Sequence, residues 1–434
     1  MKKFLVGFGG TLLLLVLATY VWSLTPRVKD PKFVERALAG AEERFQSLQA
    51  KAKDPAKNAY LNKAFLPVWG MGNDRKGGSP AENALNDWLE VSGSGDFFDH
   101  VEALKKEQGA YLKARSKFLE FYPQLAEATG KECFVAPGQT LDLSTETPDY
   151  LKVRDCAQGL VSLSQSFLAE GRGEESVRAL KEALQFAGLL QGQSLIGDMI
   201  ATAVRGKVAE ALGGNTDYLS GLSAEQWSEL AGAFHQKESS VEEFGQVMET
   251  EMVAMLKSLD GMTMGKPLQG SVPAGPPVAM PFLMHREKRM LTNQYVDVLK
   301  AIAKGQPSPP INFSWWDWLL GRTGILSSIA IPSYEKMSDQ LYFDHARQAG
   351  LFVAATIQSN LLETGSLPKE LELLQIAFPA EFPLESFDYT PSESTLFLKL
   401  PRDRVLSAVS PLPVAQPGQW MKVEENGLRF KFGE

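Results

Sequence analysis

The residue patterns that would support nucleophilic or phosphate chemistry are incomplete in this chain. A serine hydrolase of the elbow type needs Gly-x-Ser-x-Gly between a strand and a helix. Ser92-Gly93-Ser94-Gly95 instead lies in a loop that no strand precedes. A phosphate-binding loop needs Gly-x-x-x-x-Gly-Lys-Ser/Thr, and the segment 261–267 is one residue short and ends in proline. We therefore predict no catalytic residues from these motifs.

The histidines give no metal or catalytic motif either. They are isolated, and no His-Glu-x-x-His pair occurs among His100, His235, His285 and His345. Asp99 precedes His100, and Asp344 precedes His345. We interpret these neighbours as charges at helix starts beside surface histidines. Carboxylates are plentiful, but no pair of them is singled out for acid–base work.

Methionines concentrate in one stretch, where eight of the 13 fall between positions 248 and 290. Met248, Met252 and Met255 recur at helical spacing and share one face. Thioether clusters suit Cu(I) in an exported protein. Adaptable packing against a core or partner is the simpler interpretation, because only His285 lies nearby as a stronger ligand. We predict no metal and no cofactor.

An aromatic segment is the best candidate for a contact surface. It comprises Phe313, Trp315, Trp316, Trp318 and Leu319. At about 100° per residue, one helix cannot turn all three tryptophans to one side. The exposed set would rest on the bilayer interface or on a protein partner. The alternative, three tryptophans buried under the helical body, stays open.

Cys133 and Cys156 are the only cysteines, with 22 residues between them. In an oxidising compartment they could form one disulfide, which would stabilise the fold by about 3 kcal/mol through loop closure. Two independent buried thiols are the alternative. A redox role is not expected, because there is no Cys-x-x-Cys pair.

Composition places the chain among ordinary globular proteins. Of its 434 residues, 44% are apolar and 22% charged, and 52 acidic residues against 44 basic ones give a net charge of −8. A nucleic-acid-binding protein normally carries a basic surplus or stripe. We therefore expect no nucleic-acid partner.

The N-terminus contains an uncharged, mostly apolar run at residues 4–24. As a helix it would match the roughly 30 Å hydrocarbon core of a bilayer. Lys2 and Lys3 precede the run, and Tyr20 and Trp22 stand at its far end, which predicts a single-pass anchor with the N-terminus in the cytoplasm. A cleaved signal peptide ending near Ser23 is the alternative. Either segment would export the body of the chain.

Helical spacing dominates the body, and strand-like runs appear only near the end. We predict a mainly α fold: a helical-hairpin body, clearest at 149–212, with a small C-terminal antiparallel β-module, preceded by one transmembrane helix. The expected organisation is an anchor at 1–24, a helical body at 25–260, a Gly/Pro/Met-rich linker at 261–281, a helical continuation at 282–366 and the β-module at 367–434. Predicted strand runs are 387–390, 395–400, 405–409 and 420–431. The stretch 97–129 is expected to be two helices broken near Pro123.

Two stretches resemble a known kind of protein. GRTGILSSIAIPSYEKM, at 321–337, resembles a recurring piece of uncharacterised single-pass bacterial envelope proteins. The stretch 345–374 ends in Gly365, Leu367, Pro368 and Leu371, and its layout before a β-region is similar to the globular part of type II secretion pseudopilins. The chain has Glu-Phe-Pro-Leu at 381–384 instead of the Asp-Pro-Phe-type element of those proteins. Their calcium-binding side chains therefore do not carry over.

From these features we expect a non-enzymatic, membrane-anchored scaffold or interaction protein of a bacterial cell envelope. Its body would lie in the periplasm or outside the cell, with the membrane as one partner through residues 4–24 and an envelope protein as another. An exported hydrolase with dispersed carboxylates, and a protein that binds a lipid or another apolar ligand, are the alternatives.

Overall fold

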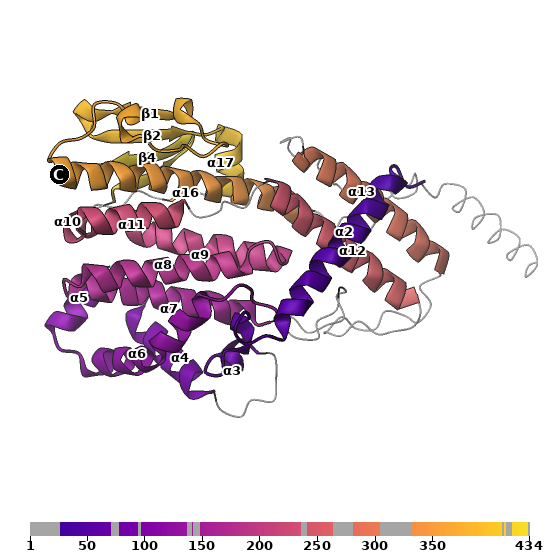
Figure 1. Cartoon of the computed structure of the whole chain (residues 1–434), viewed down its shortest axis with the longest axis horizontal. Coiled ribbons are helices and arrows are strands. Elements are labelled where there is room, and N and C mark those ends of the chain that lie inside the picture. The colour runs from indigo at the N-terminus through magenta and orange to yellow at the C-terminus, as the bar shows by residue number, and fades with distance from the viewer. Residues whose placement is uncertain are drawn as a thin grey trace, which may run out of the picture. The chain divides into compact units, whose positions relative to one another are not determined.

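The computed structural model describes residues 27–70, 78–93, 97–136, 141, 148–235, 241–263, 281–303, 332–409, 412–413 and 419–432 (Figure 1). These residues form two compact units whose segments alternate along the chain. The described residues of unit 1 are 27–47, 141, 241–263, 281–303 and 332–336. Those of unit 2 are 48–70, 78–93, 97–136, 148–235, 337–409, 412–413 and 419–432.

In its described part, unit 1 is built from the long helices α2 (Pro31–Ala52, to residue 47), α12 (Val241–Thr263) and α13 (Pro281–Ala303). Its interior includes Met248, Met252 and Met290, which are buried as packing methionines should be. Ion pairs join the helices at their surfaces. Arg44 of α2 pairs with Glu249 of α12 at 3.0 Å, and Lys300 of α13 pairs with Asp30 at 2.8 Å.

Unit 2 begins with a stack of helices, and their bounds are η1 (Ala59–Leu61), α3 (Leu66–Trp69), α4 (Pro80–Ser92), α5 (Phe97–Lys105), α6 (Gly109–Thr129), α7 (Tyr150–Ala169), α8 (Gly173–Leu190), α9 (Leu195–Gly213), α10 (Asp217–Gly221) and α11 (Ala224–Phe234). Helices α7, α8 and α9 form the predicted hairpin array. Ser194 caps α9 through the N–H of Gly197, and Ser223 and Gln226 form a capping box on α11.

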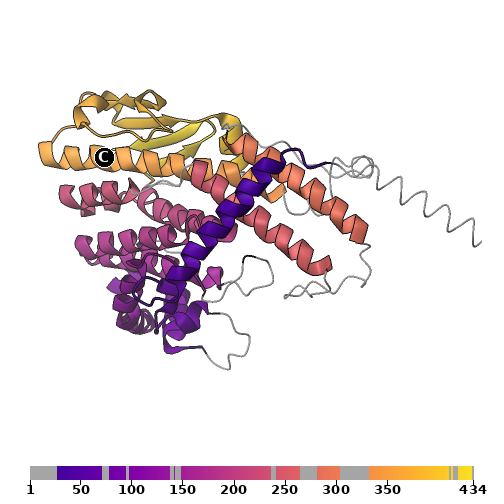
Figure 2. The same cartoon turned by 45° about the vertical axis from the view of Figure 1, so that its right-hand side comes forward.

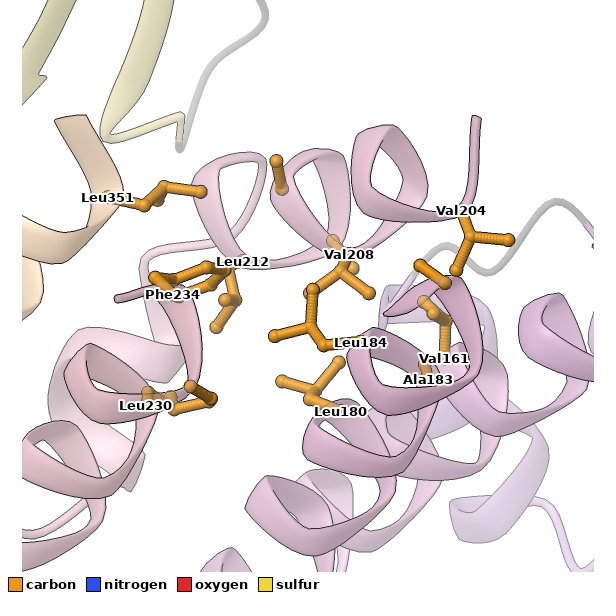
Figure 3. Close-up of a cluster of buried hydrophobic side chains, with 14 of the residues drawn as sticks. Val161, Leu180, Ala183, Leu184, Val204, Val208, Leu212, Leu230, Phe234 and Leu351 are labelled. Atoms are coloured by element: carbon orange, nitrogen blue, oxygen red, sulfur yellow. The ribbon is translucent and has the colours of Figure 1, made fainter. Parts of the chain in front are cut away.

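The core of unit 2 runs between these helices. Apolar side chains from α7, α8, α9, α11 and α16 meet in it, including Val161, Leu180, Leu184, Val208, Leu212, Phe234 and Leu351 (Figure 3). Small residues let the helices approach each other closely. A Cβ on Gly159 of α7, for example, would lie 3.0 Å from Leu85 and 3.1 Å from Phe118.

The break predicted near Pro123 is wrong. Pro123 lies inside α6, and the chain breaks earlier, between Lys105 and Gly109. Glu107 adopts a left-handed φ of 46° there, which ends α5 and turns the chain into α6. The helix around Pro123 is held by tertiary packing, since Phe118 and Leu125 on either side of it are buried.

A long helix and a small sheet complete unit 2. The helix is α16 (Pro332–Thr364, in unit 2 from Met337), followed by 3₁₀ turns η2 (Leu371–Leu374) and η3 (Leu384–Ser386). Strands β1 (Phe387–Thr390), β2 (Thr395–Lys399), β3 (Met421–Glu424) and β4 (Gly427–Lys431) form one antiparallel sheet in the order β1-β2-β4-β3. The turn η4 (Pro391–Glu393) joins β1 to β2, and helix α17 (Arg402–Ala408) follows β2.

The sheet covers one side of α16 (Figure 1 and Figure 2). Leu396 and Leu398 of β2 and Leu428 and Phe430 of β4 are fully buried. Gly350 of α16 permits the close approach, because a Cβ there would lie 2.7 Å from the Phe430 ring. The mainly α fold with a small C-terminal antiparallel sheet is thus as predicted.

One predicted strand is wrong. The run 405–409 lies mostly in helix α17, which begins just after Pro401. Proline fixes its own φ and suits a helix start. The helix buries Val405 and leaves most of its other residues at least partly exposed, so an alternating β face is not needed there.

The predicted anchor at 4–24 lies outside the described residues. Among the helices that the structure describes, none is long and apolar enough to cross a bilayer.

The two cysteines are separate, free thiols in this structure, and no disulfide joins them. Cys133 packs with Ala52 and Val135, whereas Cys156 lies in α7 within the main core. Burial raises the pKa of both thiols, which disfavours the reactive thiolate. The predicted disulfide stays open to a direct test: thiol labelling of the unfolded, unreduced protein should find none, and labelling of both would refute it.

Candidate functional site

A groove of about 850 Å³ opens on unit 2. Its walls come from four segments: the outer face of α9, the part of α16 that begins at Met337, the end of α17, and β3. These segments are far apart in the sequence, and the packing of the sheet on α16 and of α16 on α9 brings them together (Figure 1). The volume lies in the range of ligand-binding clefts.

Apolar side chains form much of the groove. Met337, Leu341 and Phe343 of α16 are buried beneath it, and Met421 of β3 is buried beside it. Met199 of α9 is 47% exposed, which is unusual for a large apolar side chain on an otherwise well-packed helix. Methionine adapts its shape to different partners, so this lining suits a ligand with apolar groups of varied shape.

Positive charge predominates along the same lining. Lys207, Arg347 and Lys422 contribute cations, and Glu210 is the one lining carboxylate among the described residues. Lys207 pairs with Glu210 at 2.8 Å on the exposed surface of α9. Lys422 is exposed and forms no ion pair with any described residue. The groove is therefore locally basic on a chain whose net charge is −8.

A buried ionic cluster supports the groove from behind. Asp344 of α16 is fully buried; Arg205 of α9 donates from Nε to its Oδ2 at 2.5 Å, and Arg347 donates from Nη2 to its Oδ1 at 2.9 Å. Burial acts to raise the pKa of Asp344, but the two guanidinium groups outweigh it and hold the pKa below its usual value. Two cations share one carboxylate, so the cluster keeps a net positive charge at the groove wall.

The neighbouring residue on α9 makes room for this cluster. A Cβ on Gly206 would lie 3.0 Å from Nη2 of Arg347, so the glycine lets the arginine lie across the helix. Arg205 also donates from Nη1 to Oε1 of Gln191 at 3.2 Å. The cluster thereby fixes α9 against α16 and sets the width of the groove between them.

Strand β3 presents an unpaired edge in the groove. It is an edge strand of the sheet and, among the described strands, pairs only with β4. Lys431 donates its N–H to the carbonyl of Trp420, so alternation along the ladder directs the backbone groups of Lys422 and Glu424 to β4. The N–H and C=O groups of Met421 and Val423 point the other way and have no partner among the described residues.

Two contacts hold the start of this strand at the C-terminal end of α9. The backbone N–H of Trp420 donates to the carbonyl of Gly213 at 3.0 Å, and its indole Nε1 donates to the carbonyl of Leu212 at 2.5 Å. Met421 then lies so close to Gly213 that a Cβ there would be 2.5 Å from its own. The edge of β3 is thus held in place before any ligand binds, which reduces the ordering cost of binding.

His100 and His345, the two histidines that follow an aspartate in the sequence, are buried. Their interpretation as surface histidines is therefore wrong. His100 is fully buried, with Nδ1 2.7 Å from the hydroxyl of Tyr111 and its ring against Trp88. His345 is buried with Nδ1 3.3 Å from Oε2 of Glu381. Imidazole combines a flat apolar ring with polar nitrogens, and the site of His100 uses the two properties together.

Other buried polar groups belong to separate structural clusters. Ser164, Ser176 and Tyr218 connect α7, α8 and α10, with oxygen–oxygen distances of 2.8 and 3.1 Å. Burial raises the pKa of Glu182 in α8 to about 7, although the Tyr122 hydroxyl and Arg178 act to lower it. Within the described part of the chain, no three His, Cys, Asp or Glu residues are grouped to hold a metal ion. The hydrolase alternative stays a prediction.

The predicted contact surface cannot be placed. Phe313, Trp315, Trp316, Trp318 and Leu319 lie outside the described residues. The groove residues were missed by sequence reasoning because they come from four segments that lie far apart in the sequence. One signal did exist: Asp344 and Arg347 stand three residues apart in the mostly apolar stretch 341–357 of α16, where charges need partners.

Comparison with protein-family models, with curated proteins and with solved structures gave no match to this chain.

Proposed function

We propose that this protein is a non-enzymatic, membrane-anchored interaction protein of a bacterial cell envelope. In this proposal its unit 2 binds an extended segment of a partner protein along the edge of β3. The observation that carries it is the backbone of Met421 and Val423, which has no partner among the described residues and lies at the side of an apolar, basic groove. An added strand would satisfy those groups by the ladder hydrogen bonds used in β-augmentation.

The groove also indicates what the segment should look like. Side chains alternate along a strand, so every second residue of the ligand would face the apolar floor near Leu341 and Met421. Acidic residues between or beside them would meet Lys207 and Lys422. A segment with alternating apolar and acidic residues fits both features.

The membrane part of the proposal is supported by the apolar run at 4–24 and by the resemblance to envelope proteins. After carbonate and high-salt washing, the full chain should remain in the membrane fraction. Release of a fragment that begins near Leu24 would instead establish a cleaved signal peptide.

The docking part can be tested by photocrosslinking in intact cells. A photoreactive residue in place of Lys422 on β3 should give a crosslinked partner, and one in place of Asp388, on the opposite edge strand β1, should not. Val423→Pro removes an N–H that a docked strand would use and that no ladder bond to β4 needs. The substitution should therefore abolish the crosslink and leave the sheet intact.

A matched proline separates docking from folding. Lys422→Pro removes an N–H that faces β4 and should lower the free energy of unfolding by about 1–3 kcal/mol. Val423→Pro should lower the free energy of unfolding by less than about 1 kcal/mol, and a urea titration measures both losses. If the photoreactive residue at position 422 still crosslinks the partner in the Val423→Pro variant, strand addition at this edge is excluded.

A further inference from the structure

Unit 1 contains a second groove, of about 630 Å³, which the proposed docking of a partner does not use. It is formed by the residues just before α2 and by α2, α12 and α13. Its apolar lining includes Val34, Leu38 and Leu256. Its charged lining includes the cations Lys257, Lys288 and Arg289 and one carboxylate, Asp260. A lining that combines apolar groups with an excess of positive charge suits a ligand with an anionic end and an apolar end.

The three cations are not equally available. Lys257 pairs with Glu42 at 2.7 Å, and Lys288 contacts both carboxylate oxygens of Asp260 at 2.7 Å. Arg289 is half-buried and forms no ion pair with any described residue. Its guanidinium group keeps donors suited to the paired oxygens of a phosphate.

The pKa of His285, which also lines the groove, is lowered by burial and by the positive charges around it. Partial burial lowers the pKa of His285, and Arg289 and Lys288 lower it further, whereas Asp260 acts in the opposite direction. His285 is therefore neutral at neutral pH, and the fixed charge of the groove comes from the lysines and Arg289.

The chain itself limits how far this groove can be from a membrane. Val28, which lines the groove, is four residues after Leu24, the last residue of the predicted span. Four extended residues reach at most about 14 Å. The headgroup layer is itself about 5–7 Å thick on each side of a bilayer. A groove on so short a tether is within reach of lipid headgroups.

We propose that the unit 1 groove binds an anionic phospholipid of the bilayer that holds the anchor. Arg289 binds the headgroup phosphate, and the apolar lining at Leu38 and Leu256 packs against the first carbons of an acyl chain. The proposal rests on the membrane anchoring in the proposed function. Charge complementarity and the short tether favour a lipid over a soluble anion.

The test is equilibrium binding of fluorescent phosphatidylglycerol to the purified full chain in detergent micelles, followed by anisotropy. Arg289→Gln should weaken binding about tenfold. The control is Lys32→Gln, because Lys32 is an exposed α2 cation that neither lines the groove nor forms an ion pair with a described residue. It should change binding less than twofold. Phosphatidylcholine should bind at least tenfold more weakly than phosphatidylglycerol.

Three results would overturn the proposal. Equal weakening by Arg289→Gln and Lys32→Gln would indicate diffuse attraction to the surface. Displacement of the lipid by millimolar inorganic phosphate would indicate a site for a free anion. No phosphatidylglycerol binding would exclude the site outright. Because the assay uses micelles, these failures are distinct from release of the chain from washed membranes, which would refute the anchor.

Discussion

The two grooves both place apolar side chains beside positive charge, but they hold that charge in different ways. In unit 2, Arg347 shares the buried carboxylate of Asp344 with Arg205. In unit 1, Arg289 forms no ion pair with any described residue. The first arginine is part of the fold, and the second is available to a ligand.

This difference separates the two kinds of recognition that we propose. The groove of unit 2 is held rigid by its ionic cluster and offers backbone groups at the edge of β3, which suits an extended peptide. The groove of unit 1 offers the Arg289 guanidinium, which forms no ion pair with a described residue, together with apolar lining residues, and this suits an anionic amphiphile. The comparison predicts that charge removal destabilises unit 2 and changes ligand binding in unit 1.

The largest expected effect is on the ionic cluster of unit 2. Asp344→Ala removes the carboxylate that Arg205 and Arg347 share and leaves two largely buried positive charges unpaired. The substitution should lower the free energy of unfolding by about 3–5 kcal/mol. Urea titration measures the loss. Asp339→Ala is the control, because Asp339 on the same helix pairs with Arg404 at 3.1 Å near the surface. It should cost less than 1 kcal/mol.

The pH dependence of this loss provides a check. The folded-state pKa of Asp344 lies below its usual 3.8, so its stabilising contribution is complete above about pH 4 and is lost as the pH falls through the folded-state pKa. The stability gap between wild type and Asp344→Asn should therefore narrow in acid. A gap that is constant down to pH 2 would mean that the carboxylate is not held ionised.

A second buried carboxylate, that of Glu182, sharpens the comparison because it forms no ion pair with a described residue. Burial raises the pKa of Glu182 from 4.5 to about 7, so the folded protein favours its protonated form. Its contribution is most favourable below pH 4.5 and is lost as the pH rises through 7. Relative to Glu182→Gln, the wild type should lose about 2 kcal/mol of stability between pH 5 and pH 8. Parallel stability curves for the two proteins would contradict this.

Local patterns predicted the fold well where one element's own residues decide its structure. The hairpin array at 149–212 follows helical spacing, and helices α13 and α16 occupy nearly all of the described parts of the predicted helical continuation at 282–366. The errors at Pro123 and at 405–409 both arose where context decides. A proline inside α6 is tolerated because packing holds the helix, and Pro401 starts a helix in a region of strands.

The grooves were beyond sequence reasoning for a different reason. Their residues are placed by contacts between elements, as when Gly206 of α9 makes room for Arg347, 141 positions later in the chain. The residues 341–357 do place the charged pair Asp344 and Arg347 in a mostly apolar stretch, but nothing in that stretch points to Arg205, which completes the cluster. The predicted tryptophan surface at 313–319 lies outside the described residues and stays a prediction.

The smallest expected effect is in unit 1, and it decides whether the contrast between the two arginines holds. Arg289→Gln removes a half-buried charge that has no ion-pair partner among the described residues. It should therefore change the free energy of unfolding by less than about 0.5 kcal/mol in urea, since surface substitutions away from specific contacts rarely do more. Arg347→Gln, which deprives Asp344 of one of its two guanidinium partners, should cost several times as much. If both substitutions destabilise the protein equally, Arg289 is a structural residue. It would then not be available to bind a phosphate, and the proposed lipid site would be refuted.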